Sequence, residues 1–356
     1  MKRKHIYNIG IGILTILIAS CQHSEEPYVP TEGYIYFNTE VASRGELVTE
    51  MIGKDFGVMG YEYNGDWNTV KVQAKPNLFH AQTISWNETD KIHTYSPLKP
   101  WKAGKKYTFY GYYPTVGVTI SGNSIEGVPY LTYTLPNSPA DMKDIMTATL
   151  YDTDNSASNS VGLTFQHRLV AMNVQARNFN TPYNGKDVYV KLSNVSITYT
   201  NLKYNQVTLP MDATLPINRV EASNQSKTYS ILGNQSVLIP PTDTSTGETT
   251  AIDISNLENQ TPTTLILIPQ EGTDEANDYL KGTISFTFDY VDNTGKTIEI
   301  NDAAKVGQRN LNFDIGKNIV AGRKYALLMN FSRTSVTIAI VESGEWTDQD
   351  IDIEFE

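Results

Sequence analysis

The chain has 356 residues, of which 40% are hydrophobic, and this content is enough to build cores and argues against wholesale disorder. Its formal net charge is −11, which disfavours nucleic acid and anionic membrane surfaces as partners, because both attract clustered Lys and Arg. The sequence contains one cysteine, so no disulfide can form within the chain.

The first 20 residues have the pattern of an export signal. Residues 1–4 are basic, residues 6–18 are mostly apolar, and Ala19-Ser20 stand before Cys21. The apolar run is too short and too interrupted to favour a permanent membrane span, which needs about 20 residues. Ile18-Ala19-Ser20-Cys21 resembles a lipobox, and the resemblance implies that Cys21 carries a lipid after residues 1–20 are removed. A plain signal peptide with an incidental cysteine is the alternative.

Segments with period-two alternation follow along the chain and predict half-buried β-strands. Turn signals such as Asn64-Gly65 and Asn184-Gly185 separate them. Helical periodicity is scarce, and one short helical turn is expected within 140–150, with Asp141 as a possible cap. The expected strands include 34–39, 70–73, 107–112, 188–192, 195–199, 284–288, 336–340 and 351–355.

A change of parity marks the middle of the chain. Val161 and Phe165 share one parity, whereas Val170 and Val174 share the other. A one-residue register change moves side chains to the opposite face of a sheet. The sequence therefore predicts a turn or bulge at 166–169.

Many short strands separated by turns predict an all-β fold built from β-sandwiches. One sandwich uses about 100 residues, so this length predicts two in tandem. The expected seam is 177–186, which is polar and contains Pro182 and Asn184-Gly185.

Several segments together resemble the fimbrillin family of Bacteroides-type bacteria, whose members are lipoprotein precursors of pilus subunits. The resemblance spans most of the mature chain and implies two transthyretin-like β-sandwich domains. The matching segments are 36–44, 56–61, 107–114, 163–169, 265–270 and 321–325.

The resemblance also implies maturation by proteolysis. An arginine-specific protease would cut between Arg44 and Gly45, and the strand at 33–41 would leave a groove that a strand from another subunit fills. The residues assigned to the removed strand and its groove are Tyr34, Ile35, Tyr36, Phe37 and Val41. The alternative for Arg44 is an ordinary surface arginine in a loop.

The carboxyl terminus is the candidate donor strand. Ile351, Ile353 and Phe355 alternate with acidic residues, as suits a strand with one apolar face. The alternative is that these residues complete the second sandwich. The predicted organisation is a signal at 1–20, a lipidated tether and removable first strand at 21–44, and sandwiches at 45–180 and 181–356.

The expected location is the cell surface at the outer membrane, and the fimbrium after assembly. Acidic residues after Cys21, namely Glu25 and Glu26, resemble a signal for the outer leaflet, although a solvated tether explains them equally well. The expected partners are other pilus subunits, the outer membrane through the lipid, an arginine-specific protease and a surface ligand on a host or bacterial cell. Stalk and tip positions both remain open.

No catalytic or metal-binding motif is recognisable, so the sequence predicts no enzyme activity, no metal and no cofactor. The histidines lack HxH or HExxH spacing, and His167 is expected to be structural rather than a general base. Trp67, Trp86 and Trp101 fall in or near expected loops. Because aromatic rings can stack on sugars, a glycan-binding surface lipoprotein is one alternative function. A surface hydrolase with a carboxylate in a cleft is the other.

Overall fold

The computed structural model describes residues 33–41, 50–122, 126–154, 160–241, 250–257, 260–270, 279–301 and 306–345. Regular structure in these residues is almost entirely β-strand, so the all-β prediction is confirmed. The helical segments among them are α1 (Trp67–Val70) and the 3-10 turn η1 (Pro139–Asp141). Within the same residues, no helix is long and apolar enough to span a membrane.

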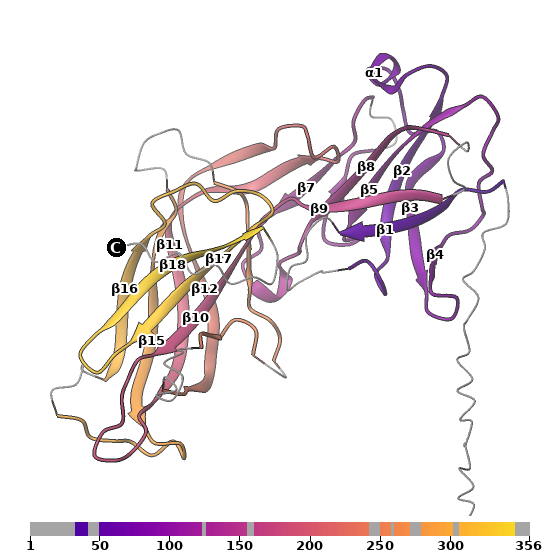
Figure 1. Ribbon diagram of the computed structural model, residues 1–356. Helices are drawn as coiled ribbons and strands as arrows, with labels where there is room; N and C mark the ends of the chain where they lie inside the picture. The colour runs from indigo at the N-terminus through magenta and orange to yellow at the C-terminus, as the bar shows by residue number, and fades with distance from the viewer. Residues whose placement is uncertain are drawn as a thin grey trace, which may run out of the picture.

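The first half of the chain forms a closed barrel (Figure 1). Its strands follow the order β1-β4-β3-β2-β5-β8-β9, and β1 closes the ring by joining β4 to β9. In an open sandwich the edges of β4 and β9 would be unpaired. Here β1 pairs with both of them and so closes the barrel. The bounds are β1 (Tyr36–Val41), β2 (Phe56–Tyr63), β3 (Phe79–Asn87), β4 (Ile92–Thr94), β5 (Lys106–Tyr113), β8 (Met146–Thr153) and β9 (Ser160–His167).

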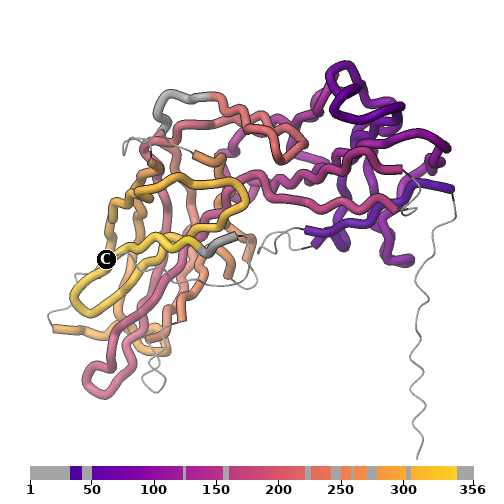
Figure 2. Tube along the Cα trace, turned by 45° about the horizontal axis from the view of Figure 1, so that its top comes forward, coloured from indigo at the N-terminus to yellow at the C-terminus, as the bar shows by residue number. Residues whose placement is uncertain are grey.

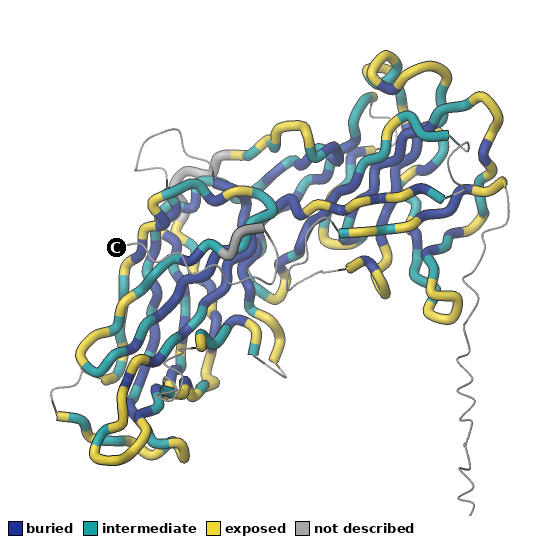
Figure 3. The backbone as a smooth tube through the Cα atoms, viewed as in Figure 1, coloured by how far each residue is buried: buried dark blue, intermediate teal, exposed yellow. Residues whose placement is uncertain are grey.

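The second half consists of two facing sheets whose inner surfaces are buried (Figures 2 and 3). One sheet has the order β13-β10-β17-β18, with β14 also paired to β10. Its strands are β10 (Val170–Asn178), β13 (Ile252–Asp253), β14 (Leu265–Leu267), β17 (Arg323–Phe331) and β18 (Val336–Glu345).

The other sheet has the order β16-β15-β11-β7-β6, and β12 pairs with the long strand β11. Two of its strands, β6 and β7, come from between barrel strands β5 and β8, so the chain enters this sheet before the barrel is complete. The bounds are β6 (Thr119–Ile120), β7 (Tyr130–Thr134), β11 (Tyr189–Pro210), β12 (Asn218–Ile239), β15 (Lys281–Val291) and β16 (Gly307–Asp314).

The predicted break at 166–169 is confirmed. β9 alternates buried and exposed residues up to His167, and β10 begins at Val170. The residues between them, Arg168 and Leu169, carry the chain from the barrel into the second half. The parity change therefore marks the crossover between the two groups of sheets.

The predicted strand at 70–73 is wrong. Val70 ends α1, and a turn follows in which the Ala74 amide bonds to the Val70 carbonyl at 3.0 Å. A residue far away in the sequence stabilises the start of this helix. The Asp152 carboxylate accepts a hydrogen bond from the Trp67 amide at 2.7 Å. The expected helical turn in 140–150 is present only as η1, because β8 begins at Met146.

The predicted domain bounds of 45–180 and 181–356 stay predictions. Strand pairing connects the two ranges, since β7 and β10 precede residue 181 and pair with β11 and β17, which follow it. One core cluster likewise contains Tyr61 and Tyr110 of the barrel together with Ile197 and Phe288 of the second half. The expected seam at 177–186 connects β10 to β11, both of which lie in the second half.

Candidate functional site

The candidate site is β1 together with the two neighbours that it joins. Along β9 it makes a parallel ladder of six residue pairs, from Tyr36 opposite Ser160 to Val41 opposite Phe165. Against β4 it makes a single antiparallel pair, Phe37 opposite His93. The strand thus depends on β9 for most of its ladder hydrogen bonds.

Two side chains of this strand region fill the interior of the barrel. Ile35 is 0% exposed and Phe37 is 3% exposed. The Phe37 ring meets four others edge-on, with centroid distances of 5.6 to 6.2 Å: Phe56, Phe79, Tyr95 and Phe109. Such pairs are each worth about 0.5–1.5 kcal/mol beyond the burial of area. Phe37 is therefore the main apolar anchor of the strand.

Burial falls toward the carboxyl end of β1. Asn38 and Glu40 are exposed, and Val41 is only half-buried. On the opposite face Tyr36 is buried and Tyr34 is 37% exposed. The buried contacts that keep this strand in the barrel are thus concentrated at residues 35–37.

A loop at 99–105 forms one wall of the site at the amino-terminal end of β1. The Ile35 amide donates to the Lys99 carbonyl, and the Trp101 amide donates to the Gly33 carbonyl, both at 2.9 Å. Tyr34 pairs with Pro100 as an isolated antiparallel bridge. This loop continues the pairing of β1 beyond the point where β4 ends.

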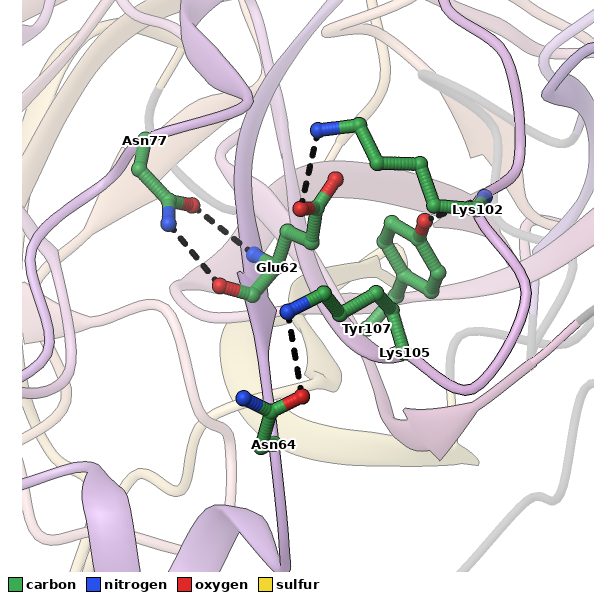
Figure 4. A network of polar contacts seen from close by, with 6 residues as sticks. All are labelled: Glu62, Asn64, Asn77, Lys102, Lys105 and Tyr107. Atoms are coloured by element: carbon green, nitrogen blue, oxygen red, sulfur yellow. Dashed lines mark hydrogen bonds and ion pairs between the residues drawn. The ribbon is translucent and has the colours of Figure 1, made fainter.

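Polar contacts tie the same loop to the rest of the barrel (Figure 4). The Lys102 amide donates to the Tyr107 hydroxyl at 2.8 Å, and its ammonium lies 3.0 Å from Glu62 Oε1. Lys105 donates to Asn64 at 3.1 Å, and Asn77 bonds both the amide and the carbonyl of Glu62 at 2.8 Å. None of these contacts involves β1, so they support the wall independently of that strand.

Loss of β1 would leave two defects in this barrel. The facing edges of β9 and β4 would present unpaired N–H and C=O groups. The interior would lose Ile35 and Phe37 and so expose an aromatic-lined groove. A strand with alternating apolar side chains would repair both defects at once.

Of the residues predicted from the sequence, Tyr34, Ile35, Tyr36, Phe37 and Val41 are brought together here. The others lie outside the described residues, and their roles stay predictions: Cys21, Arg44, Gly45, Ile351, Ile353 and Phe355. The sequence did not indicate the wall at 99–105, because its pairing with 33–35 joins segments more than 60 residues apart.

Among the residues that the structure describes, His167 and Asp144 form a buried His–Asp pair of the kind found in catalytic sites. His167 Nδ1 lies 2.9 Å from Asp144 Oδ1, and both residues are buried at the end of β9. Burial raises the pKa of Asp144 above its usual value, although the contact with His167 opposes this shift. Because solvent has little access to these two side chains, we interpret the pair as a structural contact that stabilises the crossover from β9 to β10. Among the described residues no group of His, Cys, Asp and Glu could hold a metal ion.

The tryptophans do not form the platforms that the glycan-binding alternative needs. Trp67 is 2% exposed and Trp101 is 8% exposed, and each packs into a core cluster. Trp86 is half-buried, with its indole N–H bonded to Glu88 at 2.6 Å. Sequence reasoning placed these residues near loops, but tertiary packing covers two of the three.

A family model described as fimbrillin-like matches residues 51–346. The chain belongs to the fimbrillin-like family. The predicted resemblance is therefore confirmed, and it implies a structural rather than an enzymatic role, at the cell surface and with other fimbrial subunits as partners.

Solved structures of fimbrial proteins are also similar to this fimbrillin-like chain. A fimbrial protein from Bacteroides vulgatus shares 19% identity at a TM-score of 0.64, covering 88% of this chain and 100% of its own. A fimbrilin from Porphyromonas gingivalis shares 11% identity at a TM-score of 0.39, covering 84% and 90%. At these identities the first similarity shows the fold alone, and the second carries no argument. No curated protein matches the chain.

Proposed function

We propose that this fimbrillin-like chain is a subunit of a cell-surface pilus that assembles by strand exchange and supports adhesion. It is exported as a lipoprotein, and Cys21 carries the lipid that holds it at the outer membrane. An arginine-specific protease then cuts between Arg44 and Gly45. β1 leaves with the tether, and a strand from another subunit takes its place.

The observation that carries this proposal is the position of β1 in the barrel. It is the strand that closes the ring, and it lies at the amino-terminal end of the described chain. Val41, its last residue, stands three positions before Arg44. A cut after Arg44 would therefore separate all of β1 from the other barrel strands that the structure describes.

The uncut chain is protected from premature assembly by the same geometry. β1 occupies the groove with Ile35 and Phe37 and satisfies the edges of β4 and β9. Proteolysis converts a stable intramolecular strand into one that can dissociate, because the covalent link that kept its effective concentration high is lost. Cleavage is thus the step that permits polymerisation.

The test is cleavage of lipid-free chain with an arginine-specific protease, followed by amino-terminal sequencing, native gels and electron microscopy. We expect one early cut with Gly45 as the new terminus, followed by ladders or filaments. Arg44→Ala should block the cut and the assembly. Arg309→Ala, on strand β16, is the matched control and should behave like the unaltered chain.

Two results would count against the proposal. Filaments from the Arg44→Ala chain would show that cleavage is unnecessary. A chain cut at Arg44 that stays monomeric at high concentration would remove strand exchange from the mechanism. For the lipid, radiolabelled acyl groups should attach to the unaltered precursor and not to a Cys21→Ser precursor.

A further inference from the structure

We infer that the pocket at the crossover binds an organic monocarboxylate with an apolar body, and that the Arg168 guanidinium holds the carboxylate. This pocket lies where β9 passes into β10 and has a volume of about 330 Å³. It is lined by the crossover at 166–168, by the turn between β11 and β12 with the start of β12, and by Ala321. The inference is independent of cleavage at Arg44 and of strand exchange.

Arg168 brings a buried positive charge to this pocket. Its side chain is 3% exposed, so little of the charge is hydrated. Among the described residues no carboxylate forms an ion pair with it, and Asp212 acts on it only through its electrostatic field. A buried cation without a contacting anion is costly, and a bound anion would offset that cost.

The hydrogen bonds of Arg168 leave one edge of its guanidinium group for a ligand. Nη1 donates to Thr147 and to Pro210, whereas neither Nε nor Nη2 donates to a described residue. These two nitrogens are not among the fully buried polar atoms that lack a partner, so they reach the accessible space of the pocket. Parallel N–H groups on Nε and Nη2 can hold a carboxylate with two hydrogen bonds. The edge is thus preformed for such a group.

The turn between β11 and β12 supplies an apolar wall that is already in place. Asp212 Oδ1 accepts hydrogen bonds from the amide and the hydroxyl of Thr214, at 2.9 and 2.7 Å, and the Leu215 amide donates to the Asp212 carbonyl at 3.2 Å. Leu215, Pro216 and Ile217 then line the pocket, and Leu215 is 38% exposed. An apolar ligand body would cover this wall, and a small volume of this order admits about one ring.

The charges around the pocket favour a ligand with a single negative charge. Arg219 on β12 adds a second cation to the lining, and its Nε donates to the Pro269 carbonyl at 2.9 Å. On the other side, the Asp212 carboxylate repels additional negative charge near Arg168. A monocarboxylate therefore suits the pocket better than a phosphate dianion, whose second charge would face this carboxylate.

Calorimetric titration of the uncut, lipid-free chain measures the binding directly. The probe is 3-phenylpropionate, which combines a carboxylate with a ring, and we expect a Kd below about 1 mM. Three related compounds should bind at least about 10-fold more weakly: 3-phenylpropionamide lacks the charge, acetate lacks the apolar body, and phenyl phosphate carries a second charge. N-Acetylphenylalanine has the same chemistry at a peptide end. Tighter binding of this compound than of 3-phenylpropionate would assign the carboxylate to a peptide terminus rather than to a free acid.

Two variants separate the site from the fold. Arg168→Lys keeps the charge but loses the paired N–H groups, and should weaken binding of 3-phenylpropionate at least about 10-fold. Ala213→Phe places a ring in the pocket from a half-buried position of the turn, and should block binding while the Arg168 hydrogen bonds remain. Ala103→Phe, at an exposed position in the loop at 99–105, is the matched control and should bind like the unaltered chain. Thermal unfolding confirms that each variant is folded.

Four results would overturn the inference. The unaltered chain binding no 3-phenylpropionate at about 10 mM would remove the site. Equal affinity for the acid and its amide would show that the guanidinium edge is not used, and tighter binding of phenyl phosphate would refute the preference for a single charge. Full binding by a folded Ala213→Phe chain would place the ligand elsewhere. None of these results bears on strand exchange, because the chain in this experiment is uncut.

Discussion

At the scale of single residues, Phe37 contributes more to holding the first strand in the barrel than any of its neighbours does. Its ring packs against four aromatic rings, whereas Asn38 and Glu40 on the same strand are exposed. A strand held by a small number of deep contacts is stable while it is covalently linked and can be exchanged once the link is cut. In the strand exchange proposed above, the same contacts would make the groove selective for the incoming strand.

We predict that Phe37→Ala lowers the free energy of unfolding of the uncut chain by about 3–5 kcal/mol, because it deletes a buried ring and leaves a cavity. Glu40→Ala, three residues further along the same strand, should change it by less than about 0.5 kcal/mol. Urea unfolding of both variants measures the difference. Equal effects of the two substitutions would show that β1 is not anchored at Phe37.

We predict a second residue-scale effect at the buried pair His167 and Asp144. His167→Ala leaves the Asp144 carboxylate buried without its 2.9 Å partner and should destabilise the chain by about 3–5 kcal/mol. The double variant His167→Ala with Asp144→Asn removes the buried charge and should recover part of this loss. A double-mutant cycle from denaturant unfolding measures the coupling, and additive losses would contradict it.

We also predict that the Asp144 carboxylate makes the stability of the folded chain depend on pH. Burial raises the pKa of Asp144 above its ordinary value of 3.8, so the folded chain binds this proton more tightly than the unfolded chain. Stability relative to Asp144→Asn should therefore rise as the pH falls through the folded-state pKa, and should level off below about 4. Unfolding of both proteins across this pH range tests the sign.

At the scale of strands and turns, close cross-strand contacts set which residues the barrel accepts. Gly57 on β2 pairs with Tyr112 on β5, and a Cβ atom at Gly57 would fall 1.9 Å from the Tyr112 ring. Tyr112 is itself 2% exposed, so its ring has little room to move. The glycine is required here by the neighbouring ring rather than by its own backbone conformation.

We predict that Gly57→Ala destabilises the barrel by about 1–3 kcal/mol, the usual range for overpacking a core. Gly162→Ala on β9 is the matched control, because nothing lies within 4 Å of its added Cβ atom. It should be neutral or slightly stabilising, since a strand interior disfavours glycine. Thermal unfolding of the two variants side by side checks the prediction, and a neutral Gly57→Ala would refute the steric argument.

At the scale of the whole molecule, Arg168 joins the two halves. Its side chain is 3% exposed, and one guanidinium nitrogen donates to the Thr147 hydroxyl at 2.9 Å and to the Pro210 carbonyl at 2.8 Å. Burial lowers the pKa of Arg168 to about 10, and the charge of Asp212 opposes this shift, so the side chain stays protonated at neutral pH. One buried cation thus connects β8 of the barrel to the end of β11.

We predict that Arg168→Ala separates the unfolding of the barrel from that of the second half. The Thr147 hydroxyl and the Pro210 carbonyl would lose their donor at a buried junction, a penalty of about 1–3 kcal/mol for each group. Calorimetry should show a broadened or double transition where the unaltered chain shows one. Arg168→Lys keeps a charged donor and should give an intermediate result, whereas a single sharp transition in both variants would contradict the coupling.

The sequence by itself determined the class of fold and the places where the chain changes direction. Period-two alternation is a local property that each strand carries in its own residues, as in β9 and β15, and the parity change at 166–169 marked the crossover. Local pattern failed at 70–73, where a hydrogen bond from the Trp67 amide to Asp152, 85 residues away, supports a helical turn in place of a strand. The family resemblance also came from sequence, because it depends on the order of short segments.

Only the tertiary structure decided what the first strand does. Alternation at 34–39 predicts a strand, but it cannot say that this strand runs parallel to β9, closes a barrel and rests on a four-ring site around Phe37. Local pattern likewise cannot show the wall at 99–105, the burial of Trp67 and Trp101, or the pairing of β7 with β11 and of β10 with β17. The physical reason is that strand neighbours are chosen by the packing of side chains from segments far apart in the chain, and no single segment encodes its partner.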